Sequence, residues 1–263
     1  MEFMNIKDYV TSEKKKLKEE VATLKIHREF VIVQVNDDPA SNSYIKGKLK
    51  DCAEVGIKAR LLKFDPAISE TLLIRKIKQL NKNPDVGGLI VQMPLPVHIN
   101  ETTIKQTVTP DKDVDGFHPL SKCSPCTPQG IVTYLKANNY VFSGKNALII
   151  GRSNIVGKPM AKLLLKENMS TILTHSRTTK ESMDAFIQLA DLIVVAIGKA
   201  HFLNYPHYKK DAVIIDVGIN HGTDGLEGDV APNQSVLFQS PVPGGVGLLT
   251  RLTLMKNFIS LQD

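Results

Sequence analysis

The stretch Gly151–Met160, GRSNIVGKPM, follows the short apolar run Ala147–Ile150 and has the pattern of a turn between a strand and a helix. It is not a P-loop, because five residues rather than four separate its two glycines. It also departs from the common G-x-G-x-x-G dinucleotide fingerprint, since Ser153 stands in place of the second glycine. A helix over 159–166, with Pro159 in its first turn, would direct its N-terminus at the end of the strand and favour an anion. Two alternatives stay open here: a dinucleotide site, and an ordinary strand–turn–helix without a ligand.

The rest of the chain alternates apolar runs with amphipathic segments, which predicts parallel βαβ units. The expected strands are FVIVQV (30–35), ARLLKF (59–64), GLIVQM (88–93), NALII (146–150), STILT (170–174), LIVVAIG (192–198) and AVIIDVG (212–218). The expected helices include 40–55, 69–80, 129–138 and 251–261.

A proline- and glycine-rich segment, 110–128, interrupts this alternation and indicates a junction between domains. We therefore expect an α/β protein with two α/β domains around a cleft, the second a Rossmann-like dinucleotide-binding domain. The first would span 1–120, joined by a C-terminal helix at 248–263, and the second would span 121–247.

Composition excludes several classes of protein. The 263 residues contain no apolar run long enough to cross a membrane, and the amino terminus lacks the apolar core of a signal peptide. We therefore expect a soluble, cytoplasmic protein without a membrane partner. The net charge of +6 suits a phosphate-rich cofactor, and the basic residues are too scattered to indicate nucleic acid.

Cys123 and Cys126 form a C-x-x-C motif. A structural zinc site needs four ligands, and no second pair is present, so no metal is expected. A redox pair would need a thioredoxin-like context. Two reduced thiols in a loop are the favoured interpretation, because cytosolic thiols stay reduced.

The residues after the expected strand 170–174 bear on the choice of nucleotide. An acid there would bond the ribose 2′-hydroxyl of NAD, but the chain has His175, Ser176 and Arg177. A hydroxyl and a guanidinium suit a 2′-phosphate, and Arg152 adds a second cation. This favours NADP over NAD. The alternative is that Ser176 only starts a turn and Arg177 only faces solvent.

Five polar residues stand out in the first half. Tyr44 and Lys48 are four apart on an expected helix and share a face. Gln92 ends an apolar strand, and Asp113 and Asp115 lie in the loop motif KDVDG. Each has an ordinary structural explanation when taken alone. Together they indicate an NADP-linked enzyme with a lysine, an amide and a carboxylate near a cleft.

Several longer motifs make the family recognisable, and they occur in family order from Asp37 to Thr250. The chain resembles the bifunctional methylenetetrahydrofolate dehydrogenase/methenyltetrahydrofolate cyclohydrolases. The matching segments are DDPASNSYIKGKLKDCAEVGI, GGLIVQMPLP, PDKDVDGFHP, PCTPQGI, GRSNIVGKPMAKLLL, THSRT, DLIVVAIGK, DVGIN, GDV and PVPGGVG.

This resemblance implies two α/β domains around an active cleft, NADP as cofactor, tetrahydrofolate derivatives as substrates and a homodimer. The implied chemistry belongs to one-carbon metabolism and purine biosynthesis. Methylenetetrahydrofolate is oxidised to a methenyl cation, which water then opens to 10-formyltetrahydrofolate.

The resemblance also implies roles for particular residues. Lys48 would be the main catalytic group, Gln92 would hold it, Tyr44 would pack on the folate, and Asp115 would bind the pterin edge. The substrate would also meet Pro241, Gly244 and Gly245. The implied cofactor contacts are Gly151, Arg152, Ser153, Ile155, Ser176, Arg177 and Ile219.

The chain departs from the family pattern at three places. Asn36 replaces a usual glycine, Leu248 and its neighbour replace a Pro-Met pair, and the amino-terminal segment is short. Two rivals therefore accompany the bifunctional reading. One is a dehydrogenase with weak or absent cyclohydrolase activity, and the other is a non-enzymatic NADP-binding protein.

Overall fold

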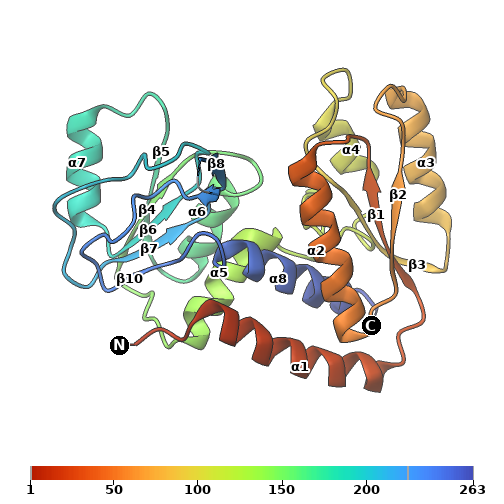
Figure 1. Cartoon of the computed structure of the whole chain (residues 1–263), viewed down its shortest axis with the longest axis horizontal. Helices are drawn as coiled ribbons and strands as arrows, with labels where there is room; N and C mark the ends of the chain where they lie inside the picture. The colour runs from red at the N-terminus through yellow and green to blue at the C-terminus, as the bar shows by residue number, and fades with distance from the viewer. Residues whose placement is uncertain (1, 224, 263) are drawn as a thin grey trace. The chain divides into compact units, whose positions relative to one another are not determined.

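The computed structural model describes residues 2–223 and 225–262, and Figure 1 shows its helices and parallel strands. The chain forms two compact units. One, the three-stranded unit, comprises Thr11–Cys126 and the chain from Arg251 onward. The other, the five-stranded unit, comprises Thr127–Thr250 and the amino-terminal residues up to Val10. The domain ranges 1–120 and 121–247 remain predictions, and the outer ends at residues 1 and 263 lie outside the described residues.

The three-stranded unit is built on a parallel sheet of order β2-β1-β3. Its strands are β1 (Glu29–Gln34), β2 (Ala59–Lys63) and β3 (Val86–Val91). In β3 all the residues are buried, as expected for a continuous apolar run in a parallel sheet. Right-handed crossovers to opposite sides of β1 place α2 (Pro39–Val55) and α3 (Glu70–Lys82) on opposite faces of the sheet (Figure 1). Helices α1 (Ile6–Leu24) and α4 (Glu101–Thr107) complete the amino-terminal half.

Local chemistry fixes the ends of α2, the helix that carries Lys48. The Asp38 side chain accepts a hydrogen bond from the Ser41 backbone N–H at 2.7 Å, and Pro39 occupies the first helical position. Gly56 ends the helix in the left-handed conformation, with φ +88°. The predicted helix 40–55 is therefore confirmed with its start one residue earlier.

The five-stranded unit has a parallel sheet of order β10-β7-β6-β4-β5. The strands are β4 (Asn146–Ile150), β5 (Ser170–Thr174), β6 (Leu192–Val195), β7 (Val213–Asp216) and β10 (Phe238–Gln239). Helix α5 (Cys126–Ala137) precedes β4, α6 (Gly157–Lys166) links β4 to β5, and α7 (Lys180–Leu189) links β5 to β6. The short strands β8 (Asn220–Gly222) and β9 (Gly225–Glu227) pair antiparallel. From β4 the chain passes to β5 on one side of β4, and from β5 it crosses back to β6 on the other side of β4. In such sheets the crevice at this switch point takes the ligand.

Strands and helices lie where the apolar runs predict them, but several helix starts differ. Helix α6 begins at Gly157 instead of residue 159, and α5 begins at Cys126 instead of 129. The last helix, α8, spans Val246–Ser260, so it starts five residues before the predicted 251. These first turns contain glycine, proline or small polar residues. Such residues weaken a periodic signal yet are well tolerated at helix N-termini. The short elements α4, β8, β9 and β10 carry no periodic signal and were not predicted.

Candidate active site

Lys48 is a buried lysine on the inner face of α2. Its side chain is only 5% exposed, and its Nζ donates a hydrogen bond to Oε1 of Gln92 at 3.0 Å. The Nζ also lies 4.9 Å from the centroid of the Tyr44 ring, one helical turn earlier. Burial lowers the pKa of Lys48, and the nearby carboxylate of Asp115 opposes that shift. The group is therefore adapted to give up and regain a proton at lower pH than an exposed lysine.

Gln92 holds this lysine from the end of β3. Its backbone N–H donates to the Val33 carbonyl at 2.8 Å, which extends the pairing between β3 and β1. Its side-chain Nε2 donates to the Met93 carbonyl at 2.7 Å, so Oε1 is the atom left to face Lys48. An amide accepts without adding charge, so it orients Lys48 while leaving its proton affinity low.

The two aspartates of KDVDG have different surroundings. Asp113 is buried and accepts hydrogen bonds from the backbone N–H groups of Gly116 and His118, at 3.1 and 2.7 Å. It therefore shapes the loop. Among the described residues nothing donates a hydrogen bond to the half-buried Asp115 carboxylate, which leaves it able to accept bonds from a ligand. Burial raises the pKa of Asp115 to about 6, while Lys48 counteracts the rise.

Two thiols accompany this cluster. Cys52 lies one turn after Lys48 on α2, and Cys126 starts α5; both are buried. Burial raises the pKa of Cys52 to about 12 and that of Cys126 well above its ordinary value. The predicted pair of reduced thiols was Cys123 and Cys126; both are free cysteines, but Cys126 starts a helix instead of lying in a loop. The sulfurs of Cys52 and Cys126 stay protonated near neutral pH. Neither competes with Lys48 as a base.

Asn36, the first departure from the family pattern, ties two loops of this unit together. Its Nδ2 donates to the Pro94 carbonyl at 2.6 Å, and its Oδ1 accepts from the Asp38 backbone N–H at 3.2 Å. It thus links the loop after β1 with the loop after Gln92. Leu248, the second departure, lies half-buried in the first turn of α8.

The turn after β4 in the five-stranded unit requires glycine at both ends. Gly151 has φ +119°, and a Cβ there would lie 2.2 Å from the Ala196 carbonyl oxygen, just after β6. A Cβ at Gly157 would lie 1.9 Å from the carbonyl oxygen of Gly151. Gly157 therefore lets α6 pack close to β4, which is the role of the third glycine in dinucleotide folds.

Ser153 explains how the turn manages without the second glycine. Its Oγ accepts from the backbone N–H groups of Val156 at 3.1 Å and Gly157 at 3.4 Å, so it holds the turn that leads into α6, whose N-cap residue is Val156. Its hydroxyl proton remains available to an acceptor outside the turn. Arg152 and Ile155 lie in the same turn, with Arg152 exposed.

The residues after β5 fit a phosphate-bearing ribose. A turn follows the strand, in which the His175 backbone N–H donates to Thr178 Oγ1 at 3.1 Å. Ser176 and Arg177 are exposed on it. Within the described part of the chain, neither Arg152 nor Arg177 has an ion-pair partner, and no acid ends the strand. These features suit NADP better than NAD.

Asp229 was missed as a functional candidate, although its GDV motif was part of the family resemblance. It is fully buried, and its carboxylate accepts from the backbone N–H groups of Ile197, Gly198 and Lys199 at 2.7, 2.9 and 2.7 Å. It thereby fixes the loop after β6, which begins beside Gly151 of the turn after β4. A Cβ at Gly218 would lie 2.2 Å from Oδ1 of Asp229, so this site depends on the glycine of DVGIN.

Ile219 follows that glycine directly, between β7 and β8, and is 53% exposed. Pro241, Gly244 and Gly245 form the tight turn before α8, where Gly244 has φ +92°. A Cβ at Gly245 would lie 2.1 Å from the Pro241 carbonyl oxygen. The predicted site residues thus fall into two sets. Tyr44, Lys48, Gln92 and Asp115 gather in the three-stranded unit, and the remaining residues belong to the five-stranded unit.

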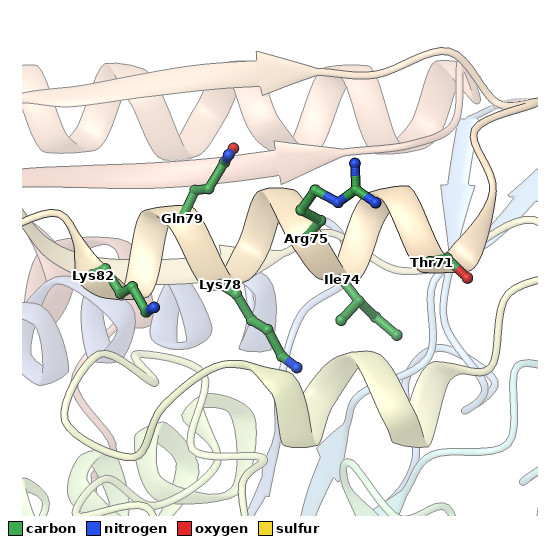
Figure 2. A pocket seen from close by; sticks show the side chains of 6 residues that line it. All are labelled: Thr71, Ile74, Arg75, Lys78, Gln79 and Lys82. Carbon is green, nitrogen blue, oxygen red and sulfur yellow. The ribbon is translucent and has the colours of Figure 1, made fainter.

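A shallow groove on α3 lies apart from these residues. It is lined by Thr71, Ile74, Arg75, Lys78, Gln79 and Lys82, whose side chains project from the helix in Figure 2. It contains no acid, thiol or histidine that would support catalysis. Elsewhere in the described residues, no three His, Cys, Asp or Glu side chains gather to hold a metal ion. None of the described helices is long and apolar enough to cross a membrane.

Family comparison covers nearly the whole chain. Residues 4–115 match the catalytic domain of tetrahydrofolate dehydrogenase/cyclohydrolase, and residues 125–263 match its NAD(P)-binding domain. The bifunctional protein FolD of Brevibacillus brevis is 43% identical over 97% of this chain and 94% of its own length. FolD of Bacillus subtilis is 41% identical over 96% and 94% of the two chains.

Solved structures agree. The bifunctional FolD of Campylobacter jejuni has a TM-score of 0.94 at 36% identity, covering 99% of this chain and 98% of its own. The Trypanosoma brucei enzyme, crystallised with NADP and an inhibitor, has a TM-score of 0.92 at 26% identity, covering 99% and 96%. These matches confirm the predicted α/β class, the NAD(P)-binding domain and the NADP cofactor. They favour the bifunctional reading over the dehydrogenase-only alternative. The chain belongs to the tetrahydrofolate dehydrogenase/cyclohydrolase family.

Proposed function

We propose that this protein oxidises 5,10-methylenetetrahydrofolate with NADP⁺ and hydrolyses the resulting 5,10-methenyl cation to 10-formyltetrahydrofolate. The observation that carries the proposal is the buried Lys48 amine, hydrogen-bonded to Gln92 and placed beside Asp115. A desolvated lysine of lowered pKa serves proton transfer, and a protein that only senses a nucleotide has no need of one.

In the first step NADP⁺ supplies the hydride acceptor. The chain's part is to bind and orient the folate. Asp115 accepts hydrogen bonds from the pterin's amide-like edge with its unsatisfied carboxylate. Tyr44 packs on the folate beside Lys48. Pro241, Gly244 and Gly245 complete the substrate contacts, because their turn brings backbone atoms to the surface without side-chain bulk.

In the second step water attacks the methenyl carbon. As the new C–O bond forms, Lys48 in its neutral form accepts a proton from the water. The bond from that carbon to N5 then breaks, N5 takes the electron pair, and Lys48 returns a proton to N5. The proton left on the hydroxyl oxygen departs to solvent as the formyl C=O forms. The reaction releases one proton overall. Gln92 keeps the Nζ of Lys48 in line throughout, through its hydrogen bond of 3.0 Å.

The cofactor contacts follow from the turn after β4 and the end of β5. Gly151, Arg152, Ser153 and Ile155 meet the pyrophosphate and the nicotinamide side, where the glycine turn and the start of α6 favour anions. Ser176 and Arg177 meet the 2′-phosphate. Ile219, between β7 and β8, offers an exposed apolar side chain to the nicotinamide side.

Assembly and location are also part of the proposal. We propose a homodimer formed through the cofactor domains, acting in the cytoplasm, without a nucleic-acid or membrane partner. Light scattering from the purified protein would give a mass near twice the 29.0 kDa of the chain if this is right.

The test replaces the lysine. Lys48→Met is expected to lower methenyl hydrolysis by roughly 10²–10⁴-fold, because it removes the proton-transferring group. Hydride transfer should survive in part, since it needs no proton from this residue. Lys46→Met is the matched control, because Lys46 is exposed on the same helix. Normal hydrolysis by the Lys48 variant would overturn the proposed role.

A further inference from the structure

The C-x-x-C motif has no part in the chemistry above, yet both of its thiols lie against one buried residue of the last helix, Asn257. Asn257 of α8 is 9% exposed. Its Nδ2 lies 3.4 Å from Sγ of Cys126, and Sγ of Cys123 lies 3.9 Å from its backbone carbonyl oxygen. All of these residues belong to the three-stranded unit.

The same asparagine holds both ends of the loop that carries Asp115. Its Nδ2 lies 2.9 Å from the Val114 carbonyl oxygen and 3.2 Å from the Ser124 carbonyl oxygen. The Cys126 thiol donates to the same Val114 carbonyl at 3.4 Å. The peptide group that joins Val114 to Asp115 is therefore fixed by two side chains.

The side chain of Val114 is fixed as well. Val114 is fully buried, and a Cβ at Gly88 of β3 would lie 2.5 Å from its Cγ2 and 2.6 Å from Cδ2 of Phe258. Because Gly88 has no side chain, strand β3 lies closer to Val114 and Phe258 than it could with any other residue at position 88. The residue immediately before Asp115 is locked by packing from β3 and α8 and by hydrogen bonds to its carbonyl.

We propose that Asn257, with the Cys126 thiol, is a positioning residue for folate: it sets where the Asp115 carboxylate stands. The inference rests on the proposed substrate-binding role of Asp115. Functional groups need to be held to a fraction of an ångström by neighbours that do not themselves touch the substrate. Asn257 has the buried, multiply bonded geometry of such a neighbour.

The experiment measures KM for methylenetetrahydrofolate and KM for NADP⁺ in Asn257→Leu. We expect KM for the folate to rise by on the order of tenfold, because a misplacement of about 1 Å can cost up to a hundredfold. KM for NADP⁺ should stay within about twofold, since the five-stranded unit supplies the proposed cofactor contacts. The acid limb of the pH profile should move as well, because Asp115 would change its surroundings.

Asn81→Leu is the matched control. Asn81 also bridges backbone groups in this unit, with its Nδ2 2.7 Å from the Thr107 carbonyl oxygen and its Oδ1 3.3 Å from the Thr109 backbone nitrogen, but its hydrogen bonds do not involve Val114 or Ser124. If both variants lose thermal stability alike and neither changes the folate KM selectively, the role is merely structural and the inference is wrong. Should Asn257→Leu not fold, Cys126→Ala decides the matter. A selective, severalfold rise in folate KM supports the inference, and an unchanged KM overturns it.

Asp115→Asn separates this inference from the proposed function. If that variant leaves the folate KM unchanged, the proposed role of Asp115 is wrong and the inference falls with it. If Asp115→Asn raises the folate KM but Asn257→Leu does not, only the positioning role is overturned.

Discussion

Gln92→Met tests how much of the hydrolysis depends on holding Lys48 in place. The substitution keeps the length of the side chain but removes the oxygen that accepts from Nζ at 3.0 Å. Hydrogen bonds to charged groups contribute about 1.5–3 kcal/mol. If all of that free energy orients the lysine in the transition state, cyclohydrolase kcat/KM falls between about tenfold and about 150-fold. The pKa of Lys48 should also fall further, because the charged form loses an acceptor.

The assay follows the disappearance of methenyltetrahydrofolate by absorbance with purified variants. Gln79→Met is the matched control, because Gln79 projects from α3 and is exposed (Figure 2). The decisive comparison is a double-mutant cycle with Lys48→Met. If Gln92 acts through Lys48, adding Gln92→Met to Lys48→Met should cause almost no further loss. If Gln92→Met lowers the kcat/KM of the Lys48→Met variant by the same factor as it lowers that of the wild type, Gln92 does not act through Lys48.

Three other changes give separate expectations. Burial raises the pKa of Asp115 to about 6, so kcat/KM for methylenetetrahydrofolate should fall below pH 6 as the carboxylate is protonated. Asp115→Asn should abolish this acid limb of the pH–rate profile, and an unchanged limb would show that another group titrates. Gly157→Ala should raise the KM for NADP⁺, because the new Cβ would lie 1.9 Å from the Gly151 carbonyl oxygen. Gly247→Ala is the control, since a Cβ there would meet no atom within 4 Å, and equal effects of the two changes would contradict the packing argument. Lys112 is buried, and its Nζ donates to the Leu80 and Asn83 carbonyls at the end of α3, at 3.2 and 2.6 Å. Lys112→Met should therefore lower the free energy of unfolding in denaturant by about 1–3 kcal/mol. An unchanged unfolding midpoint would show that Lys112 does not stabilise this helix end.

Much of the fold could be predicted because buried parallel strands leave a strong local signal. The segments around Val33, Leu89 and Ile149 are apolar runs, and the apolar residues of each lie buried in a strand. Helix starts at Gly157 and Val246 escaped prediction, since their first turns lack periodic apolar residues. The two-residue strand β10 exists only through pairing with β7, which no local pattern records.

The candidate site was predictable in part. The spacing of Tyr44 and Lys48 on one helix face and the position of Gln92 at a strand end are local features, and the structure brings the three together. The choice between Asp113 and Asp115 could not be made from the residue types, because both aspartates belong to the same KDVDG motif. It depends on which carboxylate the loop's own N–H groups occupy.

The role of Asp229 could not be predicted from local sequence. Nothing near it in sequence reveals that its carboxylate will accept from Ile197, Gly198 and Lys199, about thirty residues away. Its function is visible only once the loop after β6 and the segment after β9 are placed against each other in the same unit. The role of Gly218, which makes room for that carboxylate, cannot be predicted from the neighbouring residues either.

The most direct test of the central claim uses the unmodified protein with methylenetetrahydrofolate and either NADP⁺ or NAD⁺. Reduced cofactor and methenyl product are followed at two wavelengths in the same reaction. The account predicts reduction with preference for NADP⁺ and little accumulation of the methenyl product, because Lys48 supports its hydrolysis at the same site. Reduction with a steadily accumulating methenyl product would contradict it, and so would folded protein that reduces neither cofactor.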